Sequence, residues 1–129
     1  MSLLKNILLL LLLFSPRLSH SQSRAIDSLQ KIIDEGKIDL ETNFALNNIA
    51  IEYTRTDMGK AKTYLHQAMA VANSLKNDVT LSNSYSQMIT LQMNMGKKDS
   101  AVYYLQLLKK LSDGGSVKIK SSYNLAAGL

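Results

Sequence analysis

One spacing of small and apolar residues recurs three times in this chain and constrains its fold more than any other feature. Each copy begins with alanine and continues with apolar residues at the fourth and seventh positions after it. The copies are Ala25, Leu29 and Ile32; Ala61, Leu65 and Ala68; and Ala101, Leu105 and Leu108. These offsets place the side chains on one stripe of an α-helix. The leading alanine lets the backbone of a neighbouring helix approach closely.

The alanines that lead the second and third copies, Ala61 and Ala101, lie 40 residues apart. A period of this length in a helical pattern is typical of stacked helix pairs. We therefore expect an all-α protein, with Asp39 and Asp57 capping the helices that follow them and Gly36 ending the first. The expected helices cover residues 24–35, 39–55, 58–76, 79–95, 98–111 and 117–129.

The first 21 residues resemble a secretory signal peptide. Lys5 precedes an unbroken apolar run, Ile7–Phe14, and Ser19-His20-Ser21 places small residues where cleavage before Gln22 would occur. The alternative is a membrane anchor, but a spanning helix needs about 20 apolar residues and this run is much shorter. The pattern favours export to the periplasm or the extracytoplasmic face of the membrane. It predicts membrane contact only through this segment or through a missing C-terminal region.

Composition argues against several classes of function. Fifteen lysines and arginines face ten acidic residues, and cysteine is absent, so a disulfide frame and a thiol nucleophile are excluded. Pairs such as Lys97-Lys98 are typical of solvated helix ends, and no basic surface with interleaved aromatics suggests nucleic-acid binding. His66 is the only histidine after residue 21, and no nucleophile, base and orienting acid form a pattern. We expect no enzyme, cofactor, metal or small-molecule substrate.

The repeated pattern is similar to tetratricopeptide repeats over residues 24–129. The family's first-helix positions match Leu46, Ile49, Ala50 and Tyr53, and again Tyr85, Met88, Ile89 and Gln92. Gly96 matches its turn glycine, while Leu108 and Ile89 replace small residues and the usual proline is absent. The resemblance implies a right-handed α-solenoid of antiparallel helix pairs. It divides residues 22–129 into a capping helix (24–36), repeat 1 (39–76), repeat 2 (78–112) and the start of a truncated repeat 3 (117–129), so that the last pair is incomplete.

The order of segments also resembles a narrower group of proteins. The layout is similar to that of the exported N-terminal regions of Bacteroidetes-type sensor proteins. It consists of a signal, a short helix ending in Gly-Lys-Ile-Asp, and degenerate repeats. This resemblance implies the sensing or scaffold region of a larger membrane signalling protein. Two alternatives stay open: a self-contained exported adaptor, and an enzyme whose catalytic part follows Leu129.

A solenoid of this family binds a protein or peptide segment on the face lined by its first helices. We therefore expect a peptide-binding groove from residues that lie off the core stripes on the two first helices. Asparagine in such a groove can grip a peptide backbone through its paired donor and acceptor, but the same residues are also typical of a solvated polar face. The expected groove residues are Asn47, Ile51, Thr54, Arg55, Ser86, Thr90 and Asn94.

Overall fold

The computed structural model describes residues 2–6 and 16–129. All regular structure in these residues is helical, which confirms the expected all-α class. The helices are α2 (Pro16–Asp34), α3 (Leu40–Tyr53), α4 (Met58–Ser74), α5 (Asp78–Asn94), α6 (Lys98–Asp113) and α7 (Val117–Ala127). Residues 2–6 form a further short helical segment. Within the described ranges, no helix is both long and apolar enough to cross a membrane.

Local signals in the sequence account for most of the helix ends. The side chains of Asp39, Asp57 and Asn77 accept hydrogen bonds from the backbone N–H of the third residue of α3, α4 and α5, respectively, at 2.8 to 3.0 Å. The hydrogen bond from the Thr42 backbone N–H holds the pKa of the Asp39 carboxyl below its ordinary value. Gly36 and Gly96 follow α2 and α5 with φ angles of 66° and 71°. A left-handed residue of this kind stops a helix, and glycine adopts it without steric cost.

The first long helix begins eight residues earlier than the expected range of 24–35. Helix α2 starts at Pro16 and runs without interruption through residues 19–21, where the sequence predicts a cleavage site. Proline is favoured at the first position of a helix because its missing N–H has no helical partner there, and no glycine or proline follows until Gly36. The apolar run that predicts the signal, Ile7–Phe14, lies wholly outside the described residues, so the signal stays a prediction.

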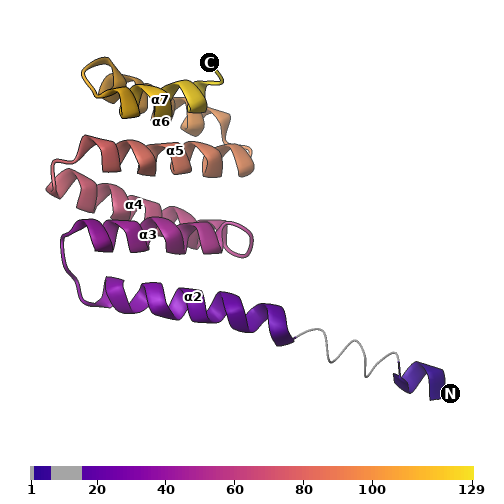
Figure 1. Ribbon diagram of the computed structural model, residues 1–129. Coiled ribbons are helices and arrows are strands. Elements are labelled where there is room, and N and C mark those ends of the chain that lie inside the picture. Colours follow the sequence, from indigo (N-terminus) through magenta and orange to yellow (C-terminus); the bar gives the residue numbers. More distant parts are fainter. Residues whose placement is uncertain (1, 7–15) are drawn as a thin grey trace.

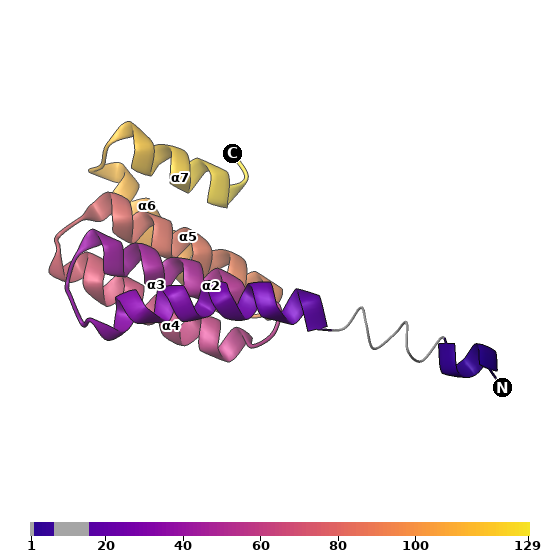
Figure 2. The same cartoon turned by 60° about the horizontal axis from the view of Figure 1, so that its bottom comes forward.

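Consecutive helices pack against one another along the stack (Figure 1), most closely α3 with α4 and α5 with α6. In the turned view of Figure 2, α2 lies in front of α3 and α4, and α7 lies at the opposite end of the stack. Helix α5 also contacts α7 and, more sparsely, α3. In Figure 1, α3, α5 and α7 face the viewer, while α4 and α6 lie partly behind them. The main buried cluster joins α3, α4 and α5 through residues such as Ala50, Leu65 and Met88.

The recurring stripe lies in these helix contacts. Its residues in α4 and α6 are at most 3% exposed except Leu105, which is half-buried like the three stripe residues of α2. Ala68 and Leu108, which occupy equivalent places in α4 and α6, are both fully buried. The same stripe position therefore holds a methyl group in one helix and an isobutyl group in the other.

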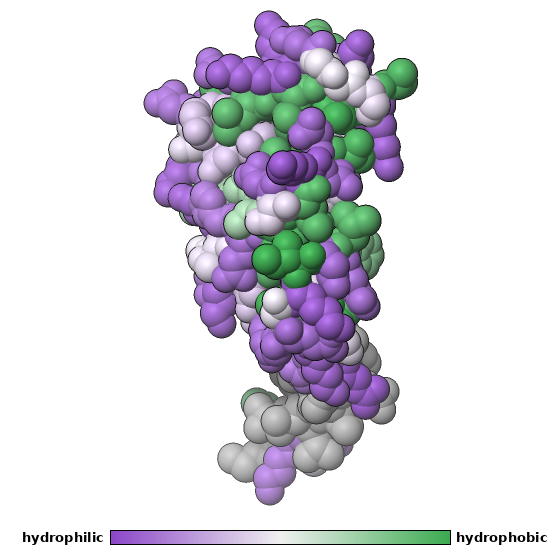
Figure 3. Space-filling view, turned by 90° about the vertical axis from the view of Figure 1, so that its left-hand side faces the viewer, coloured by the Kyte–Doolittle hydropathy of each residue, from purple (hydrophilic) through white to green (hydrophobic). Residues whose placement is uncertain are grey.

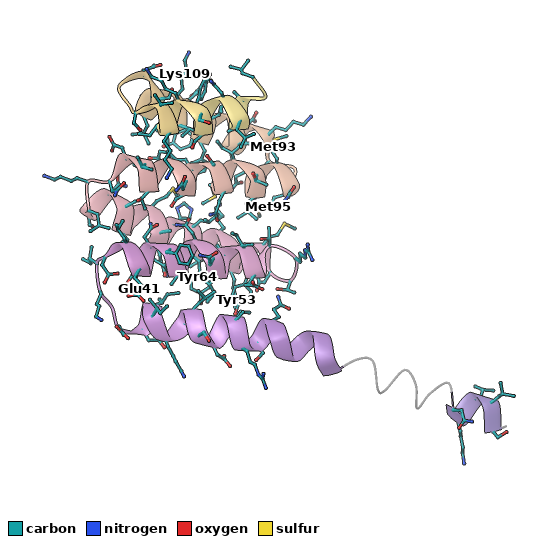
Figure 4. All side chains as sticks on the ribbon, viewed as in Figure 1. Glu41, Tyr53, Tyr64, Met93, Met95 and Lys109 are labelled. Carbon is teal, nitrogen blue, oxygen red and sulfur yellow. The ribbon has the colours of Figure 1, made fainter. Side chains whose placement is uncertain are left out.

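Tyrosines connect the helices beside the core. The rings of Tyr53 and Tyr64 stack with centroids 5.8 Å apart, and Figure 4 shows both residues at the level between α2 and α3. The Tyr64 hydroxyl donates to Gln30 Oε1 at 2.9 Å, and burial raises the pKa of this phenol. The amide of Gln22 donates to the Glu52 carbonyl at 3.0 Å. These contacts attach α2 to both α3 and α4.

Candidate functional site

A groove of about 840 Å³ is formed by α3, α5 and α7. We call it the central groove. Helix α5 contributes half of its lining residues, and α3 and α7 contribute the others. It is lined by Leu40, Asn43, Phe44, Asn47 and Asn48 of α3, by Thr80, Asn83, Ser86, Gln87, Ile89, Thr90, Met93 and Asn94 of α5, and by Ser122, Leu125 and Ala126 of α7. A smaller hollow of about 230 Å³ lies beside it and shares Gln87 and Thr90.

The structure brings most of the expected groove residues together. Asn47, Ser86, Thr90 and Asn94 line the central groove. Ile51 and Thr54 line the smaller hollow. Arg55 is exposed and belongs to neither lining.

Asn47 has a different environment from the one the sequence suggests. It is only 7% exposed. Its Nδ2 donates to Asn43 Oδ1 at 2.8 Å and to the Asn43 carbonyl at 2.9 Å, and its Oδ1 accepts from the Ser84 hydroxyl at 3.0 Å. Asn43 Nδ2 in turn donates to the carbonyl of Ala68 at 2.7 Å. Both polar atoms of Asn47 are therefore engaged inside the protein. Its amide helps to join α3, α4 and α5, and it is not free to bind a peptide backbone as the sequence suggests.

Most of the accessible polar groups of the central groove lie on α5, while Asn48 of α3 and Ser122 of α7 are half-buried in its lining. The hydroxyl of Ser86 donates to the Ser82 carbonyl at 3.0 Å, and that of Thr90 donates to the Ser86 carbonyl at 3.2 Å. Their hydrogens are thus used within the helix, while oxygen lone pairs stay open. Asn83 and Asn94 are exposed. The groove therefore offers hydroxyl acceptors together with the exposed amides of Asn83 and Asn94, which can both donate and accept.

Large apolar side chains are exposed beside these polar groups. Leu40 and Phe44 of α3 are 56% and 67% exposed, Met93 of α5 is 51% exposed and Leu125 of α7 is 84% exposed. Figure 4 labels Met93 near the end of α5. Figure 3, seen from the side where α2 joins α3 and α4 joins α5, shows hydrophobic patches separated by hydrophilic residues. Apolar groups gathered around a hollow are typical of a surface that binds another molecule.

Several lining residues have no counterpart in the sequence-based set, notably Asn43, Phe44, Asn83 and Leu125. Asn83 lies three residues before Ser86, so helical spacing could have identified it. Phe44 and Leu125 could not be identified in this way, because an apolar residue on a helix predicts burial unless the packing is known.

His66 lies away from the central groove. It is exposed on α4 and lines a separate shallow hollow together with Lys62 and residues of α6, including Asp99. In the part of the chain that the structure describes, no three His, Cys, Asp or Glu side chains are grouped so that they could hold a metal ion.

The described residues thus form an all-helical protein in which consecutive helices pack together and three of them form a groove. Comparison of the chain with protein-family models, with curated proteins and with solved structures found no match.

Proposed function

We propose that this chain is a protein-interaction module of the tetratricopeptide type, a right-handed solenoid of antiparallel helix pairs that binds a peptide segment of another protein. Three features support the architecture: the stripe that recurs 40 residues apart, the short turns at residues 54–57 and 95–97, and the packing of each helix on the next. In such a stack the first helices of the pairs are α3, α5 and α7, and these helices line the central groove.

The observation that carries the binding function is the lining of this groove. Every side chain in it is uncharged, and exposed Phe44 and Leu125 stand beside the hydroxyls and amides of α5. A peptide presents the matching combination of backbone N–H and C=O groups and apolar side chains. Affinity in this mode comes from a preordered surface and requires no reaction.

The setting that we propose is extracytoplasmic. The N-terminal pattern favours export, and the resemblance to exported sensor regions favours a place in a larger membrane signalling protein. A self-contained exported adaptor is the alternative.

N-terminal sequencing of the secreted product tests export. Gln22 or Arg24 is expected as the first residue, and Met1 as the first residue would contradict export. The coding sequence after codon 129 separates the two settings: a membrane helix followed by a kinase or DNA-binding module supports the sensor, and an immediate stop supports the adaptor.

Panning of a displayed random heptapeptide library against the folded protein tests the binding function. We expect enriched peptides whose binding is abolished by Thr90→Trp, because an indole at this exposed position fills the groove. The matched control is Thr63→Trp on α4. Thr63 is also exposed, makes the same bond to the carbonyl four residues earlier at 3.2 Å and lies outside the groove lining. Absence of enrichment, or binding that survives Thr90→Trp with the helical circular dichroism spectrum intact, would refute the proposal.

A further inference from the structure

Three polar residues on α5 form a row along the central groove. Ser86, Thr90 and Asn94 follow one another at intervals of four residues, and all three line the groove. Because an α-helix rises 1.5 Å per residue, successive members of the row lie about 6 Å apart along the helix axis. We call these residues the α5 row.

The spacing of the α5 row is close to the repeat of an extended peptide. Two residues of an extended chain advance about 6.6 Å, and alternate residues direct their N–H groups to the same edge. Over the whole row the two lengths are about 12 Å and about 13 Å, a mismatch of about 1 Å. A bound helix would not match, because its N–H groups are used internally.

The row presents acceptors to a ligand. The hydroxyl hydrogens of Ser86 and Thr90 are engaged by carbonyls of α5 itself, so their free lone pairs accept from backbone N–H groups. The exposed amide of Asn94 supplies a further acceptor through its oxygen. No charged side chain lies among the lining residues, so an ionised side chain of a ligand would meet no opposite charge there.

The two sides of the groove suit the side chains of such a peptide. In an extended chain successive side chains point to opposite faces. When the hydrogen-bonding edge faces α5, one set of side chains faces α3 and the other faces α7. Phe44 on α3 and Leu125 on α7 are 67% and 84% exposed there, and contact with apolar ligand side chains would remove both from water.

From this geometry we infer that the occupant of the central groove is an uncharged, extended peptide segment lying along α5. Its alternate backbone N–H groups donate to Ser86, Thr90 and Asn94, and its apolar side chains contact Phe44 and Leu125 in turn. The inference rests on the proposed peptide-binding function. It adds that the bound peptide is extended, that it is uncharged and that its axis is parallel to α5.

The test takes a peptide enriched by the panning described above and methylates its backbone nitrogens one at a time. Each methyl group removes one N–H donor. We expect a loss of affinity at every second residue over about five residues, and little change at the residues between them. A loss pattern with no period of two, or a set of enriched peptides with a charged centre, would overturn the inference while leaving peptide binding intact. Absence of any enriched peptide would overturn both, so the two failures are distinguishable.

A pair of protein variants provides a second readout. Thr90→Val keeps the shape of the side chain and removes its acceptor. The net worth of one hydrogen bond predicts that Kd rises about 2- to 12-fold. Thr63→Val removes the same kind of hydroxyl from α4 and should leave Kd unchanged. Equal Kd values for the two variants would show that the Thr90 hydroxyl contacts no ligand N–H group.

Discussion

Asn43, Asn47 and Ser84 form a buried polar connection between α3, α4 and α5. All three are at most 7% exposed, and their bonds reach from the Ala68 carbonyl on α4 through α3 to α5. A buried amide that loses its partners costs more than the bond itself is worth, because the group has already lost its water. Such fully paired networks favour one arrangement of the surrounding elements over shifted alternatives.

Asn47→Ala should therefore destabilise the protein although the residue lines a surface groove. The substitution leaves Asn43 Oδ1 and the Ser84 hydroxyl without their present partner, and we expect the free energy of unfolding to fall by about 1–3 kcal/mol. Urea denaturation followed by circular dichroism measures the change. Asn83→Ala is the matched control, since that asparagine is exposed in the same groove and should change stability by less than about 0.5 kcal/mol. Equal stabilities for the two variants would contradict the structural role of Asn47.

At the scale of elements, α4 shows how the alanine stripe determines packing. Ala61, Leu65 and Ala68 are 1%, 2% and 0% exposed, and the carbonyl of Ala68 accepts the Asn43 amide. Helix α3 thus approaches the backbone of α4 closely at this point. The equivalent place in α6 is Leu108, whose surroundings leave room for a larger side chain.

Ala68→Leu tests this close approach. Three additional carbons at a fully buried position must displace α3, and overpacking of this kind costs about 1–3 kcal/mol. A lower thermal midpoint is expected relative to Ala70→Leu, which places the same side chain on the exposed face of α4. If both variants melt at the same temperature, Ala68 does not lie at a tight helix crossing.

The connection between α6 and α7 depends on a second close approach, at Gly115. A Cβ atom there would lie 2.5 Å from the Leu111 carbonyl oxygen and 2.9 Å from Ile119 Cδ1. Backbone cannot yield as a flexible side chain does, so Gly115→Ala should displace the start of α7 and lower stability by about 1–3 kcal/mol. Gly114→Ala serves as the control, because a Cβ at that position meets nothing within 4 Å. Thermal melts of the two variants should differ, and coincident melts would show that the connection adjusts freely.

At the scale of the whole molecule, the stack has a well-buried middle and weaker ends. Helix α5 contacts α3, α4, α6 and α7 and buries seven residues. Helix α7 contacts α5 and α6, and Ile119 is its one fully buried residue in the described structure. In a stack whose units contact their neighbours, local stability follows the number and size of these contacts.

Hydrogen exchange should reveal this gradient. We expect backbone amides in the middle of α5 to exchange slowest, and those of α7 to exchange faster, because opening α7 exposes little apolar surface. Mass spectrometry of peptides covering residues 81–92 and 119–126 measures the difference in the same sample. Protection of α7 equal to that of α5 would require a further contact on α7, such as another segment or a second copy of the chain.

Short-range chemistry in the sequence determined the helices and most of their ends. Asp39, Asp57 and Asn77 cap backbone groups within three residues, and Gly36 and Gly96 end helices through their own φ angles. Tertiary structure alone decided the groove and the role of Asn47, whose partner Ser84 lies 37 residues away. Helical spacing tells on which side of the helix a side chain lies. It carries no information about which distant side chain will contact that residue. The sequence therefore specified the helices, whereas only packing assigned some of their polar residues to the interior and left Phe44 and Leu125 exposed.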